Sequence, residues 1–251
     1  MFVEVLVALQ FLTILRLRTA LPFDDVTLGR SGAFFPLVGL FLGAVVWVVD
    51  LSLSLVFPSA QSNVFLIVAL GAFTRGLHLD GVADSADGLW GGGDKQRRLA
   101  IMKDSRIGAF GTLALLGIVL TKLRALDVLQ GDGRSSALLL SPMYGRWACV
   151  VMAALAVPAR EEGLGAMFVR GVQLRELGLA SAFTLLAGLY VVGFVNIELF
   201  GVLAGLAIAF TRYCARQLGG VTGDTLGAVG ELVETAAFCL FAALASGGSR
   251  H

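Results

Sequence analysis

The spacing of apolar residues constrains this chain more than any other feature of its sequence. Long apolar runs alternate with short charged stretches over almost all of the 251 residues. A helix needs about 20 mostly apolar residues to cross a bilayer, and lipid leaves unpaired backbone groups without partners. The runs are residues 2–15, 33–57, 63–77, 109–126, 135–157, 177–194, 197–211 and 225–246. They predict an all-α, polytopic integral membrane protein with about seven or eight transmembrane or interfacial helices.

The overall composition fits a protein whose main solvent is lipid. Hydrophobic residues make up 57% of the chain and charged residues 15%, and the mean hydropathy is +0.85. No linker or low-complexity stretch divides residues 1–251, so a single membrane-embedded domain is expected, with the lipid bilayer as its surroundings. No basic block is long enough to suggest nucleic acid as a partner. The three cysteines stand alone inside apolar runs and are predicted to be buried free thiols: Cys149, Cys214 and Cys239.

The basic residues predict how the chain is oriented. If the runs cross the bilayer alternately, one side receives the connections 16–32, 78–108, 158–176 and 212–224. These connections hold most of the Lys and Arg: Arg16, Arg18, Arg30, Lys95, Arg97, Arg98, Lys103, Arg106, Arg160, Arg170, Arg175, Arg212 and Arg216. The positive-inside rule makes this side cytoplasmic. The first run is short, so it is expected to be tilted or to lie at the interface.

The segment HLDGVADSADG, residues 78–88, carries the densest group of acids. On a helix, Asp80, Asp84 and Asp87 are spaced so that they share one face. Three like charges this close repel one another, and a divalent cation would relieve the repulsion. Hard carboxylate oxygens suit Mg²⁺, which is often held by a few carboxylates together with substrate phosphates. The alternative is a helix end with ordinary solvated charges, although the small residues between the acids favour close approach of a helix or ligand.

His78 begins this segment and lies roughly opposite the three aspartates on a helix. It is therefore interpreted as an interfacial histidine with its hydrogen bonds satisfied, rather than as a metal ligand. Asp94 is a candidate N-cap for a short cytoplasmic helix that follows.

A second charged cluster lies in IMKDSRIGAFG, residues 101–111. Lys103 and Arg106 are suited to bind phosphate oxygens, the arginine through its planar fork and the lysine as a point charge. Asp104 interrupts this basic stretch and is a candidate fourth metal ligand and catalytic residue. The alternative is an ordinary basic loop at the membrane surface.

A third cluster begins the last apolar run, in GDTLGAVGELVE, residues 223–234. Asp224 and Glu231 share a helix face, and Glu234 follows one turn later inside the predicted hydrocarbon region. Intramembrane carboxylates are costly, at about 2.5–3.5 kcal/mol on insertion scales, so they indicate function by default. Gly223 and Gly227 form a G-x-x-x-G pattern, whose simplest role is helix packing.

Arg146, within SPMYGRW, is a charge inside an apolar run and needs a buried anionic partner. That partner is either one of the acids above or a substrate phosphate. The alternating topology brings all three clusters to the cytoplasmic side. We therefore expect Asp84, Asp104, Asp224 and Glu231 as catalytic residues, Lys103, Arg106 and Arg146 as phosphate-binding residues, and Asp80, Asp84, Asp87 and Asp104 as metal ligands.

Together, these segments resemble the cobalamin synthase family, the adenosylcobinamide-GDP ribazoletransferases. The similarity extends from FLTILRLRTALPF and FFPLVGLFLGAV near the N-terminus through the motifs above to the last helix. It implies a single catalytic domain in the bacterial cytoplasmic (inner) membrane, with its active site facing the cytoplasm. It also implies an Mg²⁺-dependent transferase that joins GDP-activated cobinamide to α-ribazole or its 5′-phosphate and releases GMP.

Two other classes of protein share parts of this pattern. DSADG, residues 84–88, reproduces the start of the D-x-x-D-G motif of CDP-alcohol phosphotransferases, but the rest of that motif does not follow. A secondary transporter would use the acids as a cation relay, yet the chain lacks a visible internal repeat and its acids gather near one face. The sequence is also compatible with a homo-oligomer.

Overall fold

The structure is a computed structural model that describes residues 2–15 and 21–248. Arg16 and Arg18 of the first predicted cytoplasmic connection lie outside the described residues. Within the described ranges the chain forms helices and no β-strand. The helices are α1 (Phe2–Leu12), α2 (Asp25–Ser31), the 3-10 helix η1 (Gly32–Phe34), α3 (Phe35–Leu53), α4 (Ser59–Phe73), α5 (Leu77–Trp90), α6 (Lys95–Ile101), α7 (Ala109–Val128), α8 (Gly131–Leu155), α9 (Leu164–Gly171), α10 (Leu174–Val192), α11 (Val195–Leu218) and α12 (Gly223–Gly248).

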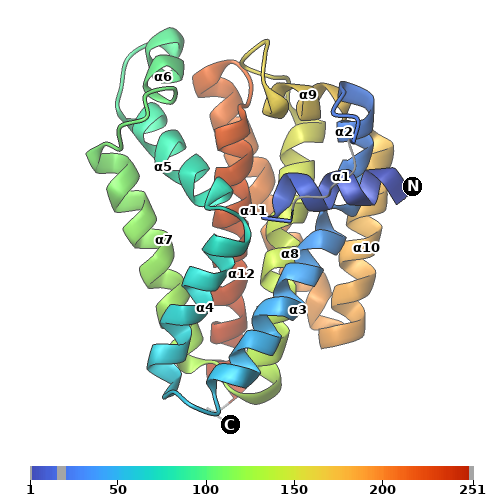
Figure 1. Ribbon diagram of the computed structural model, residues 1–251, viewed down its shortest axis with the longest axis vertical. Helices are drawn as coiled ribbons and strands as arrows, with labels where there is room; N and C mark the ends of the chain where they lie inside the picture. The colour runs from blue at the N-terminus through green and yellow to red at the C-terminus, as the bar shows by residue number, and fades with distance from the viewer. Residues whose placement is uncertain (1, 16–20, 249–251) are drawn as a thin grey trace.

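The predicted polytopic all-α architecture is confirmed. Among the described residues, six helices are long and apolar enough to cross a membrane, and a seventh span results if α4 and α5 are counted as one bent crossing. The long helices run roughly along the vertical axis of Figure 1. Helices α2, α6 and α9 gather at the upper end, whereas α12 ends at the lower end. The described parts of the connections predicted to be cytoplasmic therefore lie at the upper end.

Two segments depart from a simple alternation of crossings. Helix α1 lies crosswise to the long helices (Figure 1), as expected for an apolar run too short to span. Helices α4 and α5 are related by a bend of 88°, so the acidic segment does not continue the preceding helix. The bend contains Arg75, which is the only non-glycine residue with a positive φ, +57°, in the part of the chain described. A residue held in this region stores about 1–3 kcal/mol of strain.

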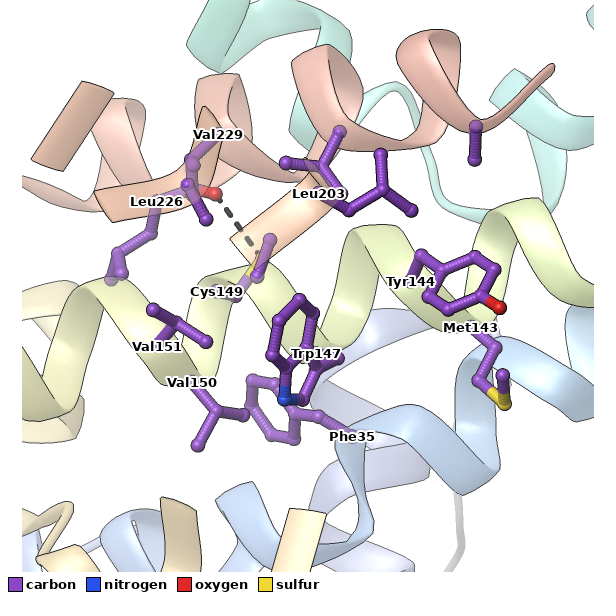
Figure 2. Close-up of a cluster of buried hydrophobic side chains, with 14 of the residues drawn as sticks. Phe35, Met143, Tyr144, Trp147, Cys149, Val150, Val151, Leu203, Leu226 and Val229 are labelled. Carbon is purple, nitrogen blue, oxygen red and sulfur yellow. Dashed lines mark hydrogen bonds between the residues drawn. The ribbon is translucent and has the colours of Figure 1, made fainter. Parts of the chain in front are cut away.

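Helix α8 forms the centre of the bundle and packs against α3 on one side and α12 on the other. Glycines permit these contacts: a Cβ at Gly43 would lie 2.4 Å from the carbonyl oxygen of Leu139. Figure 2 shows buried side chains of α8, including Trp147 and Cys149, between the neighbouring helices. The Cys149 thiol donates to the carbonyl oxygen of Leu226 in α12 over 3.2 Å. The predicted free thiols are confirmed, with Cys239 half-buried.

A polar network joins the helices at the lower end of the bundle. Arg134 of α8 forms a double hydrogen bond with Asp50 of α3, at 2.7 and 2.8 Å, and a further one with Asn63 of α4 at 2.7 Å. Trp47 also donates to Ser135 over 3.2 Å. This end of the bundle is therefore fixed by side-chain contacts between helices.

Candidate functional site

Close packing of α5 against α12 brings the first and third acidic clusters together. A Cβ at Gly81 would lie 2.5 Å from the carbonyl oxygen of Asp224, and one at Gly227 would lie 3.1 Å from the Cα of His78. Only glycine allows two backbones to approach this closely. The small residues of the acidic segment and the G-x-x-x-G pattern thus have a packing role, and its effect is to place Asp84 beside Asp224.

A large cavity opens beside this helix pair. Its volume is about 940 Å³, and residues of α1, the α4–α5 bend, α5, the loop after α6, α7 and α9 line it. The lining residues that carry charge are Arg75, Asp80 and Asp84. Ser105 and Ile107 bring the second sequence cluster to the same cavity. A concave site with a few convergent charged groups is the usual form of a ligand-binding site.

Negative charge accumulates around Asp84. This carboxylate is half-buried, and the charges that act on it are those of Asp224, Asp80, Arg160 and Asp87. Asp224 accepts a hydrogen bond from Arg160 over 3.0 Å. One guanidinium among four carboxylates leaves an excess of negative charge, and hard oxygen donors with such an excess are suited to a divalent cation.

Asp87 has a role that the sequence did not predict. Its Oδ2 accepts from the backbone N–H of Gly108 over 2.7 Å, and its Oδ1 accepts from that of Gly111 over 2.9 Å. Both oxygens are therefore bound at the N-terminus of α7, where backbone donors have no partner within the helix. Of the three aspartates expected as metal ligands on α5, Asp80 and Asp84 thus line the cavity, whereas Asp87 binds the start of α7.

Asp104 and Arg106 bind each other at the surface. Asp104 accepts from the Arg106 guanidinium over 2.7 Å, and this hydrogen bond lowers the pKa of Asp104 to about 2. Both side chains and Lys103 are outside the buried core. The loop therefore offers cations next to the cavity, whereas the Asp104 carboxylate is already engaged by Arg106.

Arg146 and Glu231 were expected in the same site, but the structure places them in a separate buried cluster. Lys122 of α7 donates to Glu231 over 2.5 Å and to Glu234 over 2.6 Å. Arg146 of α8 forms an ion pair with Glu234. All four side chains are almost fully buried. The anionic partner that Arg146 requires is thus Glu234 of α12. Neither Arg146 nor Glu231 is among the residues that line the large cavity.

His78 is more deeply placed than predicted. Its side chain is 3% exposed, and its Nδ1 has no hydrogen-bond partner among the described residues. It therefore differs from the expected interfacial histidine with satisfied hydrogen bonds. Within the described ranges, no group of three or more His, Cys, Asp or Glu side chains is arranged to hold a metal ion by itself.

Two arginines of the site were missed in the sequence. Arg75 falls within the apolar run 63–77, which predicts a helix, but it occupies the bend, lines the cavity and donates to the Gln10 carbonyl oxygen over 3.3 Å. Arg160 was counted only as a basic loop residue, yet it binds Asp224. A lone arginine before a glycine, at the end of an apolar run, was the available signal for Arg75.

The α6 prediction is confirmed. The helix begins after Asp94, whose side chain accepts from the backbone N–H of Arg97 over 2.9 Å. The N-cap thus fixes where α6 begins, and α6 leads into the loop whose Ser105 and Ile107 line the cavity.

Comparisons with known proteins agree over nearly the whole chain. The profile of the Cobalamin-5-phosphate synthase family matches residues 4–242. A Geotalea daltonii protein named adenosylcobinamide-GDP ribazoletransferase is 38% identical over 242 residues, covering 96% of this chain and 97% of the relative. A Syntrophobacter fumaroxidans protein of the same name is 43% identical, covering 93% and 97%. One from Clostridium tetani is 34% identical, covering 95% and 96%. No solved structure matches, and neither alternative class of protein is favoured.

Proposed function

The chain belongs to the cobalamin-5-phosphate synthase family, and on this premise we propose that it is an adenosylcobinamide-GDP ribazoletransferase. It transfers the phosphoryl-linked cobinamide to α-ribazole, or to its 5′-phosphate, and releases GMP. The observation that supports this activity best is the meeting of Asp80, Asp84 and Asp224 beside one large cavity. Transfer of a phosphoryl-linked group depends mainly on positioning and on neutralising charge, and a carboxylate cluster with nearby cations supplies both.

Asp80 and Asp84 are the proposed ligands of Mg²⁺. They supply two hard oxygen donors in an excess of negative charge, and no third carboxylate of the described chain completes a closed cage around them. This arrangement suits Mg²⁺, which commonly takes its remaining ligands from water and substrate phosphates. When bound, the ion would neutralise charge on the pyrophosphate of the activated cobinamide.

Asp224 is the proposed general base. Its Oδ2 is held by Arg160, so the other carboxylate oxygen, Oδ1, takes the proton of the attacking ribose hydroxyl. The hydroxyl oxygen forms a bond to the phosphorus that stays with the cobinamide. The bond from that phosphorus to the oxygen of GMP breaks, and GMP leaves with the electron pair.

Cations around the cavity would bind the phosphates. Lys103 and Arg106 follow α6 and border the lining residues Ser105 and Ile107. Arg75 lines the cavity itself and is strained in its backbone. Strain of this kind is typical of residues held for function. Arg146 and Glu231 act in this proposal through the packing of α7, α8 and α12, without touching the substrates.

We further propose that the protein lies in the bacterial cytoplasmic membrane with the cavity facing the cytoplasm. Most of the basic residues of the described loops lie at the end with α2, α6 and α9 (Figure 1), which the positive-inside rule assigns to the cytoplasm. A membrane-impermeant thiol reagent tests this. A cysteine introduced at Glu162 should be labelled only in inverted vesicles, and one at Asp132 only in right-side-out cells. The reverse pattern would contradict the orientation.

Incubation of the purified protein in lipid nanodiscs with adenosylcobinamide-GDP, α-ribazole and Mg²⁺ tests the activity. We expect GMP and adenosylcobalamin to form in equal amounts, and neither to form when α-ribazole is left out. GMP release without α-ribazole would indicate hydrolysis, and no GMP in the complete mixture would contradict the proposed function.

A further inference from the structure

A second, smaller cavity lies next to the large one beside α5. Its volume is about 170 Å³. Four residues line both cavities and so define the junction: Phe11, Leu77, Asp80 and Leu164. The rest of the lining comes from α1, α3, α5, α8, α9 and α12, and it includes His78 of α5 and Asp224 of α12. A molecule seated in the small cavity would therefore meet the carboxylates of the site at its mouth.

One wall of the small cavity is aromatic. The rings of Phe35 and Phe168 stack with centroids 4.6 Å apart and an interplanar angle of 3°. Phe11 adds a third ring, with centroids 5.9 Å from Phe35 and 6.2 Å from Phe168. Leu12 and Leu226 extend the apolar surface. Such a wall favours a flat, apolar ring system that contacts it through dispersion and ring–ring interactions.

The same cavity contains an unpartnered polar group. His78 lines it, the side chain is 97% buried, and Nδ1 has no hydrogen-bond partner within the described chain. A buried polar nitrogen without a partner is unfavourable, so such a group in a ligand cavity indicates a missing hydrogen bond. Cys149 does not supply it, because its thiol already donates to the Leu226 carbonyl oxygen over 3.2 Å (Figure 2).

We propose that this small cavity is the binding slot for the fused bicyclic base of the acceptor nucleoside. The proposal rests on the proposed function, and it names where one substrate binds. The volume is several times the ~30 Å³ of a water molecule, which leaves room for a small ring system. The base contacts the half-buried Phe11 ring, which the almost fully buried Phe35 and Phe168 rings support from behind, and His78 Nδ1–H donates to its unprotonated ring nitrogen.

Binding of the base in the slot also fixes where the ribose of the acceptor nucleoside lies. With the base in the slot, the ribose lies at the junction, where Asp80 lines both cavities and Asp224 lines the slot. The ribose hydroxyl is then presented to the proposed general base from one side, and the large cavity holds the pyrophosphate on the other. Recognition of the base and activation of the sugar are thus performed by one continuous wall of α5 and α12.

Three variants test the slot: Phe11→Leu, His78→Leu and Leu164→Trp. The first removes a ring, the second removes the donor, and the third narrows the mouth from a position that is 48% exposed and thus compatible with folding. Phe200→Leu is the matched control, because Phe200 is also half-buried and packs on another ring, Trp147, at 4.5 Å, but lines neither cavity. Size-exclusion profiles and circular dichroism in nanodiscs report folding.

Two measurements are made on each protein. The first is equilibrium binding of α-ribazole alone, and the second is the KM for each substrate in GMP release. We expect each slot variant to weaken α-ribazole binding and raise its KM by about tenfold, a change of about 1.4 kcal/mol. The KM for adenosylcobinamide-GDP should stay within about twofold, and the control should match the wild type.

The possible outcomes distinguish failure of the slot proposal from failure of the proposed function. If the wild type binds α-ribazole and releases no GMP, the proposed function fails, and loss of binding in the variants still supports the slot. If the wild type releases GMP and the folded Leu164→Trp protein binds α-ribazole as well as the wild type does, the slot proposal is overturned. Absence of α-ribazole binding to the wild type overturns it as well.

Discussion

Gly81 of α5 lies against the backbone of Asp224 at the start of α12, so closely that a Cβ at position 81 would be 2.5 Å from the Asp224 carbonyl oxygen. Real Cβ atoms do not approach an oxygen this closely, so any side chain at this position must separate the two helices. Asp84 follows Gly81 by one turn on the same helix. The spacing between the Asp84 and Asp224 carboxylates is therefore set by Gly81, which has no functional side chain.

Gly81→Ala should consequently lower the rate of GMP release sharply while the protein still folds. The added methyl forces backbone movement, and overpacking of this kind costs about 1–3 kcal/mol. A shift of the two helices also misplaces Asp84 relative to Asp224, and a misplacement of about 1 Å can lower a rate by about 100-fold. GMP release and thermal unfolding in nanodiscs provide the two measurements.

Gly205→Ala is the control for this substitution. Gly205 lies within α11, and a Cβ there would meet no atom within 4 Å. Because alanine is favoured over glycine in a helix by about 1 kcal/mol, this variant should be at least as stable as the wild type and fully active. Equal activity of Gly81→Ala and Gly205→Ala would contradict the link between helix spacing and catalysis.

Asp84→Asn should abolish turnover and leave the protein folded. The amide keeps the size of the side chain but removes the negative charge proposed to hold Mg²⁺. It also removes repulsion from Asp80 and Asp224, so the melting temperature should stay equal or rise. Asp132→Asn, on an exposed residue at the far end of the bundle, is the control. Activity of Asp84→Asn within about tenfold of wild type would refute Asp84 as an essential ligand.

Asp87→Asn should act mainly on stability. Its two oxygens accept from Gly108 and Gly111, and an amide can accept through one oxygen only. One buried N–H is left unpaired, which costs about 1–3 kcal/mol. The Mg²⁺ concentration for half-maximal activity should not change. Asp94→Asn is the matched control, since asparagine caps a helix about as well as aspartate does.

A different result would restore the role that the sequence predicted for Asp87. If Asp87→Asn required much more Mg²⁺ while its thermal stability matched that of Asp94→Asn, Asp87 would be a metal ligand rather than the anchor of α7.

The lowered pKa of Asp104 predicts how the Asp104–Arg106 pair responds to pH. Arg106 lowers the pKa of Asp104 to about 2 from an ordinary value of 3.8. The folded-state pKa lies below the unfolded one, so the stabilisation is complete above 3.8 and is lost as the pH falls towards 2. Arg106→Gln should thus leave the shape of the pH–activity profile unchanged above about pH 5 and raise the KM for adenosylcobinamide-GDP. A new ionisation above pH 5 would contradict this account.

Much of the fold was predictable, because each bilayer crossing must satisfy its own backbone and leaves an apolar run in the sequence. The crosswise α1 and the start of α6 after Asp94 followed from run length and capping. The meeting of Asp84 with Asp224 followed only in outline, from the alternation of crossings. Its geometry depends on Gly81, whose contact joins residues far apart in the chain.

The partners of individual charges were not predictable. Asp87 has the helical spacing of a ligand next to Asp84, but its oxygens bind α7, which no periodicity within α5 reveals. Glu231 shares a helix face with Asp224, yet it pairs with Lys122. Lys122 lies within the apolar run 109–126, and nothing in that run indicates its partner. Pairing of this kind depends on the rotation of separate helices about their axes, which tertiary packing sets.

Lys122 therefore provides a test of whether Glu231 is structural or catalytic. Lys122→Met leaves Glu231 and Glu234 buried with Arg146 as their remaining cation. Removal of one partner from a buried ion pair destabilises a protein by about 3–5 kcal/mol, so the variant should unfold at a much lower temperature. Arg124→Met is the control, because Arg124 is 82% exposed in its pair with Asp127 and exposed pairs contribute little.

The double variant Lys122→Met/Glu231→Gln removes one charge of each sign and keeps Arg146 paired with Glu234. Because the buried cluster is again neutral, the double variant should regain a large part of the stability that Lys122→Met loses. If Glu231 serves only to hold α7 against α12, GMP release should return together with stability. A double variant that is folded but releases no GMP would instead show that Glu231 takes part in the reaction, as the sequence pattern had indicated.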